Sequence, residues 1–271
     1  MTGIKGDYVL GTHDAEVDRL GMQHRVWRES MLAAWRRAGT WEGWRVVDVG
    51  AGPGYATLDL AEIVGPAGEV LAVERSTRFA EVLRAESRRR GLGQVKVLEG
   101  DLMEMPAPSG FDMAWCRWVA SFTASVPRLA RWIHDALRPG GCAVFHEYVD
   151  YASWQFAPPR PPLAEFVTEV MASWRASGGE PDVAPALIGA LRAEGFLLRS
   201  VRPLVFTTTP SEMTWHWPAA FVATNAIRLR ELGRVSAEWV STVIRELEAA
   251  EADPDSVMVT PMVLEVIADR V

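Results

Sequence analysis

A run of glycines follows a short apolar segment early in the chain, and an acidic residue comes twenty positions later. The segment 46–49 reads as a buried strand, and Gly50, Gly52 and Gly54 follow it with the spacing G-x-G-x-G. Glycine has no Cβ atom, so such a turn can adopt positive φ angles and lets a ligand approach the backbone closely. The amides at the start of the next helix would face that ligand. The pattern predicts a site for a nucleotide-type ligand, with Glu74 beside it.

Asp48 distinguishes this turn from that of dinucleotide-binding dehydrogenases, which space their glycines as G-x-G-x-x-G. A carboxylate behind the turn repels a pyrophosphate but attracts a ligand that carries an ammonium group. Two more carboxylates end neighbouring predicted strands. Glu74 can accept hydrogen bonds from two adjacent hydroxyls, and Asp101 can accept one from an amino group. The alternative is that both are solvated acids at strand ends.

The segment Val47–Gly54 resembles motif I of the class I S-adenosylmethionine-dependent methyltransferases. Over roughly residues 40–150, other features resemble that family in order: Glu74 after the second strand, Gly100-Asp101-Leu102 after the third, Phe111-Asp112 to Arg117 in the fourth, and Leu137 to Gly141 before the fifth. The resemblance implies S-adenosylmethionine as cofactor, with Glu74 on the ribose hydroxyls and Asp101 on the adenine amino group. The cofactor-binding residues that it indicates in this core are Asp48, Gly50, Gly52, Gly54, Glu74, Arg75, Asp101, Leu102 and Arg117.

The N-terminal stretch Tyr8-Val9-Leu10-Gly11 and the helical segment after it resemble a subset of small-molecule methyltransferases. In those proteins the helix covers the cofactor as a lid. The resemblance makes Tyr8 and Gln23 candidate contacts to the methionine end of the cofactor. A helix that serves only for packing is the alternative.

The methyl acceptor of this family lies above the ends of strands four and five, which makes Trp118, Tyr148 and Trp154 candidate substrate-binding residues. His146 is a candidate catalytic base because an imidazole titrates near neutral pH. Neighbouring residues of a strand point to opposite faces, so His146 and Glu147 cannot both enter one pocket. A histidine packed under a helix is the alternative, and His216 is a second candidate base.

Aromatic residues gather in the segments that should cover the acceptor. They are Tyr151, Trp154, Phe156, Phe166, Trp174, Trp215 and Trp217. Large planar side chains suit an apolar, aromatic small molecule. The alternative is that they form the core of the covering segment itself.

Strand-like and helix-like segments alternate from residue 45 to residue 147, which predicts a Rossmann-like α/β fold. We expect a doubly wound, seven-stranded, mostly parallel sheet in the order 3-2-1-4-5-7-6, with the last strand antiparallel, and a helical cap. Residues 149–163 hold four prolines and fit no strand. The expected divisions are an N-terminal lid at 1–40, a cofactor-binding core at 41–150, a cap at 151–195 and the rest of the sheet with covering helices at 196–271.

The composition argues against several classes of protein, among them nucleic-acid-binding and membrane proteins. A net charge of −7 over 271 residues gives no general attraction for nucleic acid. Two cysteines form no disulfide framework, and no long apolar run or leader is visible, so we expect a cytoplasmic protein that does not insert into a membrane. No Cys, His and Asp spacing is typical of a metal site.

These features together predict methyl transfer from S-adenosylmethionine to a small organic, aromatic or apolar acceptor. Two other classes remain open: an NAD-type oxidoreductase, and a protein of this fold that binds the cofactor without transferring a methyl group. An RNA methyltransferase is a further alternative. The oligomeric state is left open.

Overall fold

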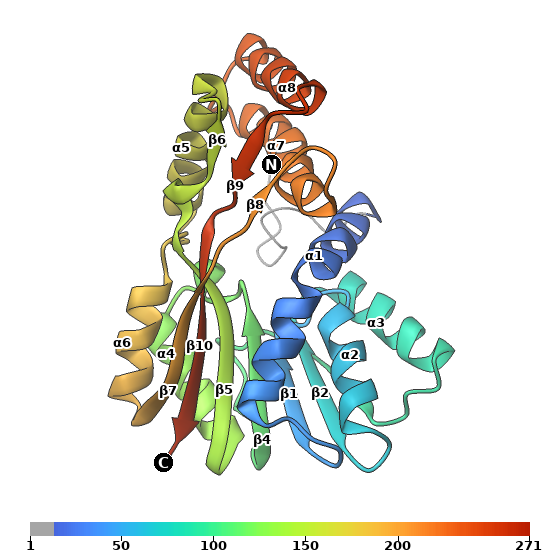
Figure 1. Ribbon diagram of the computed structural model, residues 1–271. Helices are drawn as coiled ribbons and strands as arrows, with labels where there is room; N and C mark the ends of the chain where they lie inside the picture. Colours follow the sequence, from blue (N-terminus) through green and yellow to red (C-terminus); the bar gives the residue numbers. More distant parts are fainter. Residues whose placement is uncertain (1–13) are drawn as a thin grey trace.

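The computed structural model describes the chain from residue 14 to residue 271 (Figure 1). Its centre is a seven-stranded sheet in the order β3-β2-β1-β4-β5-β10-β7. The strands are β1 (Arg45–Val49), β2 (Glu69–Glu74), β3 (Val95–Glu99), β4 (Phe111–Arg117), β5 (Leu137–Asp150), β7 (Phe196–Leu204) and β10 (Met262–Arg270). Strand β10 runs antiparallel to β5 and β7, whereas the other pairs are parallel. Counted along this sheet alone, the order is the predicted 3-2-1-4-5-7-6, so the predicted fold class is confirmed.

Helices cover both faces of the sheet, as the near-continuous apolar strands require. One face carries α1 (Asp14–Ala38), α2 (Tyr55–Val64) and α3 (Thr77–Arg89), and the other carries α4 (Val126–Ala136) and α6 (Ala184–Ala193). Trp35 of α1 and Leu60 of α2 pack on Val46 and Val144, while Leu129 of α4 and Leu187 of α6 pack on the opposite face.

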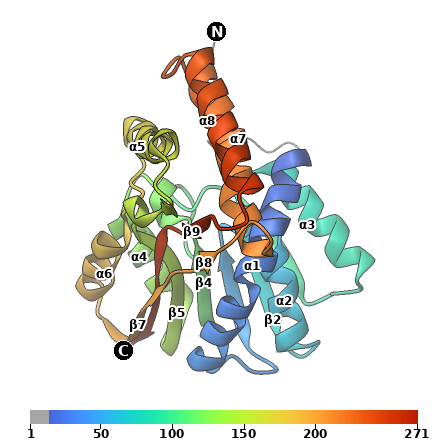
Figure 2. The same ribbon diagram turned by 45° about the horizontal axis from the view of Figure 1, so that its top comes forward.

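A second layer lies beyond the carboxyl ends of the parallel strands (Figures 1 and 2). It contains α5 (Pro161–Ala176), α7 (Met213–Glu231), α8 (Ala237–Ala252) and a small antiparallel sheet of β6 (Gln155–Ala157), β9 (Val257–Val259) and β8 (Thr207–Thr208). This layer has its own apolar core, in which Trp27 of α1 takes part. Helix α1 therefore joins the sheet to the upper layer.

The small sheet is where the expectation from the sequence is wrong. Residues 149–163 were expected to hold no strand, but β6 lies within them and pairs with β9. The segment 196–208 is divided into β7 and β8, and the segment 257–270 is divided into β9 and β10. The second break falls at Pro261, which has no amide hydrogen for a ladder. The four-part domain division stays a prediction.

The order of strands reverses between β1 and β4, and the glycine turn follows β1 at that point. Ligands of open α/β sheets bind at such a reversal, outside the carboxyl ends of the strands. Gly50, Gly52 and Gly54 all have positive φ angles, as predicted. A Cβ atom on Gly54 would collide with Leu83 of α3, so this glycine lets α3 pack against the turn.

We therefore expect Gly54→Ala to lower the free energy of unfolding by about 3 kcal/mol, because left-handed strain and overpacking add. Gly233→Ala is the matched control. Gly233 also has a positive φ, but a Cβ atom there meets nothing within 4 Å, so the strain alone should cost about 1 kcal/mol. Urea unfolding of both variants measures the difference, and equal losses would contradict the packing role.

Candidate functional site

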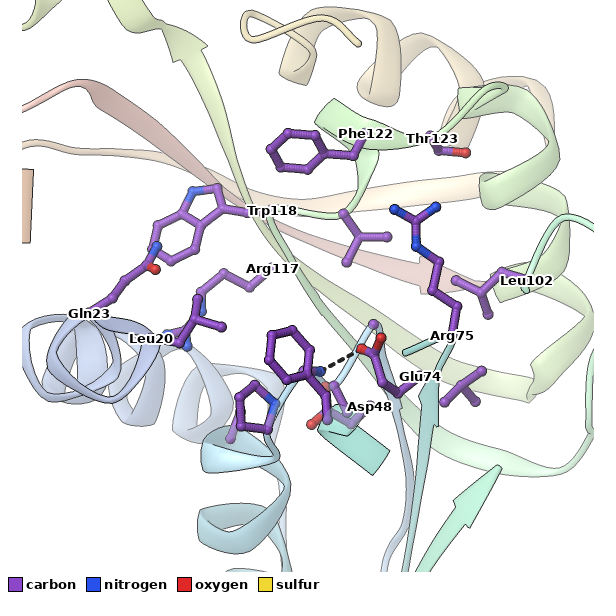
Figure 3. Close-up of a pocket in the computed structure, with 18 of the residues that line it drawn as sticks. Leu20, Gln23, Asp48, Glu74, Arg75, Leu102, Arg117, Trp118, Phe122 and Thr123 are labelled. Atoms are coloured by element: carbon purple, nitrogen blue, oxygen red, sulfur yellow. Dashed lines mark hydrogen bonds between the residues drawn. The ribbon is translucent and has the colours of Figure 1, made fainter. Parts of the chain in front are cut away.

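A cavity of about 480 Å³ opens at the carboxyl ends of β1, β2 and β4, between the sheet and the upper layer (Figure 3). Twelve of the predicted site residues line it: Gln23, Asp48, Gly50, Gly52, Glu74, Arg75, Asp101, Leu102, Arg117, Trp118, Tyr148 and Trp154. Gly54 and His146 do not line it, and Tyr8 lies outside the described residues. Residues that are far apart in the sequence thus meet in one place.

Glu74 connects the end of β2 to the glycine turn. Its buried carboxylate accepts hydrogen bonds from the backbone N–H of Gly52 at 2.8 Å and of Ser76 at 2.7 Å. Burial raises the pKa of Glu74, and these two hydrogen bonds oppose that rise. Each carboxylate oxygen retains a lone pair for a ligand hydroxyl, and Figure 3 shows the side chain at the edge of the cavity beside the turn.

Gly50 and Gly52 lie in the same turn but serve different purposes. A Cβ atom on Gly50 would collide with Val119, whereas one on Gly52 would meet nothing within 4 Å. Gly52 lines the cavity, so the free space beside it is the space that a ligand would occupy. Gly50 instead lets the loop after β4 approach the turn.

Asp48 lies beneath the turn with its carboxylate almost fully buried. Its Oδ2 atom accepts a hydrogen bond from the Thr57 hydroxyl at 2.6 Å, and burial raises the pKa of Asp48 to about 6. A cationic group bound beside it would favour the charged form.

Asp101 differs from Asp48 in its exposure to solvent. It is exposed at the cavity rim, where its Oδ1 accepts the Met103 N–H at 2.8 Å.

Arg117 ends β4 on the same face of the sheet as Asp48. Its guanidinium lies 5.0 Å from the centre of the Trp118 ring, and Nη1 is 3.9 Å from the Met31 sulfur of α1. Burial lowers the pKa of Arg117 to about 10, and Asp48 opposes that shift. The side chain extends toward α1, where Leu20 and Gln23 lie (Figure 3).

Aromatic side chains form the remaining wall of the cavity, which we call the aromatic chamber. Its members are Trp118, Phe122, Tyr148, Tyr151, Trp154, Trp174, Trp217 and Phe221. The Trp118 ring stacks on Tyr148 and on Trp217 at 5.6 and 6.0 Å between ring centres. Planar aromatic side chains can pack against flat apolar groups.

The chamber takes only part of the aromatic set that the sequence indicated. Trp215 and Phe166 are fully buried in the upper core instead, and Phe156 packs against it. Phe122 and Phe221 were not foreseen. Phe221 lies four residues after Trp217, on the same face of α7, and this helical spacing is the signal that could have found it.

His146 is fully buried under α1 and does not line the cavity. Its ring lies between Trp27 and Trp115, and its Nε2 atom is 3.6 Å from the carboxylate of Glu265. Burial lowers its pKa. The structure therefore separates the expected base from the site. His216 is exposed on α7 and does not line the cavity either.

Glu147, the next residue, supports the loop that follows β4. Its buried carboxylate accepts the N–H groups of Val119 at 2.8 Å and Ala120 at 2.9 Å, and the Ser121 hydroxyl at 3.3 Å. Burial raises the pKa of Glu147 to about 7, although these donors favour its charged form. An acidic residue within a buried strand was the available signal for this role.

Between residues 14 and 271 no His, Cys, Asp or Glu side chains form a group of three or more that could hold a metal ion. No helix in that range has the length and apolar character needed to cross a membrane.

Residues 46–141 match a family model described as a methyltransferase domain. Demethylmenaquinone methyltransferase of Geobacillus kaustophilus (strain HTA426) is 32% identical over 123 residues, which cover 45% of this chain and 51% of that protein. The enzyme of the same name from Lactococcus lactis subsp. lactis (strain IL1403) is 29% identical, again over 123 residues, with 45% and 48% covered. The chain thus spans about half the length of the curated relatives it matches.

Solved structures resemble the chain over a larger part of its length. Geranyl diphosphate methyltransferase in complex with SAM has a TM-score of 0.59 at 15% identity, covering 94% of this chain and 90% of that one. The YcgJ protein of a Bacillus species has a TM-score of 0.60 at 16% identity, with 90% and 98% covered. The [4+2]-cyclase SpnF has a TM-score of 0.56 at 20% identity, with 88% and 78% covered. At these identities the likeness shows the fold alone.

The raised pKa of Glu147 makes stability depend on pH. A carboxyl whose folded pKa is about 7, against 4.5 ordinarily, contributes stability that is present below pH 4.5 and lost as pH rises through 7. Glu147→Gln keeps the shape but cannot titrate. Between about pH 5 and about pH 8, the unfolding free energy of the wild type should therefore fall by up to about 3 kcal/mol more than that of Glu147→Gln.

Urea unfolding at several pH values measures this difference. Asp48, whose pKa is also raised, titrates in both proteins, so the comparison isolates Glu147. If the unfolding free energies of the two proteins changed equally with pH, the result would show that burial does not raise the pKa of Glu147.

Proposed function

We propose that this chain, which belongs to the class I S-adenosylmethionine-dependent methyltransferases, transfers a methyl group from S-adenosylmethionine to a small organic acceptor with an apolar or aromatic body. The observation that carries the proposal is the arrangement around Gly52. The backbone of Gly52 is open to the cavity and lies between two carboxylates. Glu74 would accept hydrogen bonds from the ribose hydroxyls, and Asp48 would pair with an ammonium group.

The residues present fit this cofactor along its whole length. Glu74 would receive the ribose hydroxyls, and Arg75 and Leu102 lie beside it, where the adenine would lie (Figure 3). Asp101 lines the same cavity. Asp48 would pair with the ammonium of the amino-acid end, and Gln23 of α1 lines the same cavity. When bound, the cofactor supplies a reactive sulfonium methyl.

The chain's own contribution is positioning and the exclusion of water. Attack on a sulfonium methyl needs the acceptor held in line and desolvated, and a rigid aromatic wall can do both. We assign this task to the aromatic chamber, with Trp118, Tyr148 and Trp154 as acceptor contacts. The relatives named for demethylmenaquinone agree with an acceptor that has a flat apolar ring.

Within the described residues we assign no catalytic base, because His146 is buried away from the cavity. The N-terminal lid stays part of the proposal, as does Tyr8. Helix α1, which is part of that lid, contributes Arg19, Leu20 and Gln23 to the cavity wall, and this supports the proposal.

S-adenosylhomocysteine should bind the wild type in calorimetry, and Gly52→Val should abolish binding because its side chain would fill the space beside the turn. Gly91→Val is the matched control, since Gly91 also has a positive φ and empty space around it but lies outside the cavity. Its binding should be retained. Production of S-adenosylhomocysteine with a panel of apolar ring acceptors then tests transfer. Binding of NADH in place of S-adenosylhomocysteine would overturn the proposal.

Affinity for S-adenosylhomocysteine should also depend on pH. Asp48 has a pKa of about 6 when free and must be charged to pair with the ligand ammonium, so binding should weaken about tenfold for each pH unit below 6. Methylthioadenosine lacks the amino-acid end but keeps the ribose. Its affinity should show no such dependence on pH, and it therefore controls for any effect of Glu74 titration. Asp48→Asn should bind S-adenosylhomocysteine weakly without the slope, and a slope that survives this substitution would assign it to another group.

A further inference from the structure

The first turns of helix α1 carry a buried ion pair at the wall of the cavity. Arg19 lines the cavity, and its guanidinium carbon lies 5.9 Å from the centre of the Phe221 ring, a member of the aromatic chamber. The Nε and Nη2 atoms of Arg19 donate to the two carboxylate oxygens of Glu16 at 2.7 and 2.6 Å. Both residues are more than nine-tenths buried. A hydrogen-bonding cation therefore borders the aromatic chamber.

Its position separates Arg19 from the other arginines of the cavity. Within residues 14–271 two more arginines line it, and both are next to carboxylates assigned to the cofactor. Arg75 follows Glu74 in the chain, and Arg117 interacts electrostatically with Asp48. Arg19 instead lies against the chamber wall that α7 supplies, where α1 and α7 pack together (Figure 1). This places Arg19 on the side of the acceptor.

The ion pair limits what kind of group Arg19 can bind. Glu16 balances the charge of Arg19, so a carboxylate or phosphate at this place would be repelled by Glu16 while it is attracted by Arg19. An uncharged oxygen meets no such opposition and can accept a hydrogen bond from the guanidinium. Arginine has five N–H donors, so Arg19 can donate to Glu16, to the Gln23 side-chain oxygen at 3.4 Å and to a ligand at the same time.

Burial of this ion pair calls for a reason other than stability. Removing two charges from water costs about as much free energy as their attraction returns, so such a pair contributes little to the stability of the fold. Two parallel hydrogen bonds do, however, fix the plane of the guanidinium. A donor held in this way loses little conformational freedom when a ligand binds, and it can therefore select the ligand by the place of its oxygen.

We propose that Arg19, oriented by Glu16, donates a hydrogen bond to an uncharged oxygen on the ring of the methyl acceptor. The chamber selects a flat ring, and Arg19 selects the oxygen that the ring carries. The acceptor class narrows to hydroxylated or ketonic aromatic rings, and it excludes plain hydrocarbons and ring carboxylates. This inference rests on the proposed function and makes Arg19 a specificity-determining residue.

The test uses three ring probes and the complex of the protein with S-adenosylhomocysteine, in which no transfer can occur. 2-Naphthol carries an uncharged oxygen at neutral pH, naphthalene carries no oxygen, and 2-naphthoate carries a carboxylate. Equilibrium dialysis at about pH 7 measures the affinity for each probe. The wild type should bind 2-naphthol most tightly of the three.

Arg19→Met removes the donors and keeps an unbranched side chain. It should weaken 2-naphthol by about tenfold, the effect of losing one hydrogen bond, and leave naphthalene unchanged. Calorimetry should show unchanged binding of S-adenosylhomocysteine, which also shows that the variant is folded. Arg25→Met is the matched control, because Arg25 is an exposed arginine of the same helix that does not line the cavity. It should bind all three probes as the wild type does.

Glu16→Gln keeps Arg19 and removes the charge that balances it. This variant should bind 2-naphthoate about tenfold more tightly than the wild type does, because the carboxylate then meets a cation without the opposing charge of Glu16. An ion pair that only supported the fold would not change the choice between an uncharged and an anionic ring. This variant also decides the question if Arg19→Met fails to fold, since no gain for 2-naphthoate would overturn the proposal.

Other outcomes would overturn the assignment in different ways. Equal weakening of 2-naphthol and naphthalene by Arg19→Met would mean that Arg19 only shapes the chamber, and unchanged 2-naphthol binding would place the oxygen elsewhere. Weaker binding of S-adenosylhomocysteine alone would assign Arg19 to the cofactor. Failure of the wild type to bind the ring probes while it binds S-adenosylhomocysteine would refute the acceptor class only. Failure to bind S-adenosylhomocysteine would refute the proposed function itself.

Discussion

The hydrogen bond from the Gly52 amide to the Glu74 carboxylate is the interaction on which the site depends. It joins the turn after β1 to the end of β2 and directs a buried acid at the ligand space. The same acid accepts the Ser76 amide just before α3 begins. One side chain therefore sets the position of the turn and of the start of a helix, while its free lone pairs point toward the cavity.

A second buried acid performs the equivalent task on the other side of the turn. Glu147 holds the amides of Val119 and Ala120, and Val119 approaches the backbone of Gly50 so closely that no Cβ fits there. The loop after β4 is thus fixed to the turn by packing and to β5 by hydrogen bonds. Burial opposes the charge of both Glu74 and Glu147, and the donated hydrogen bonds offset part of that cost.

The sequence predicted the main sheet because its strands are apolar runs bounded by glycines, and it predicted the cofactor side because those residues lie within a few positions of strand ends. The sequence did not predict the small sheet because strands of two or three residues are too short to show a periodic pattern. The prediction that His146 faces the site was wrong because the alternation of side chains along a strand shows which residues share a face of the sheet. It does not show where α1 covers that face. Two positions further along, Tyr148 leaves this cover and reaches the chamber.

Trp118 shows why the acceptor side is harder to derive than the cofactor side. It has a φ of 54°, the left-handed region that a bulky residue rarely adopts, and its N–H donates to the His146 carbonyl at 3.0 Å. Such a backbone costs about 1–2 kcal/mol, which its ring contacts with Tyr148 and Trp217 can offset. Those partners come from β5 and α7, so the conformation at residue 118 is set by tertiary contacts that no local pattern encodes. A glycine there would relieve the strain and remove the ring that borders both Arg117 and the chamber.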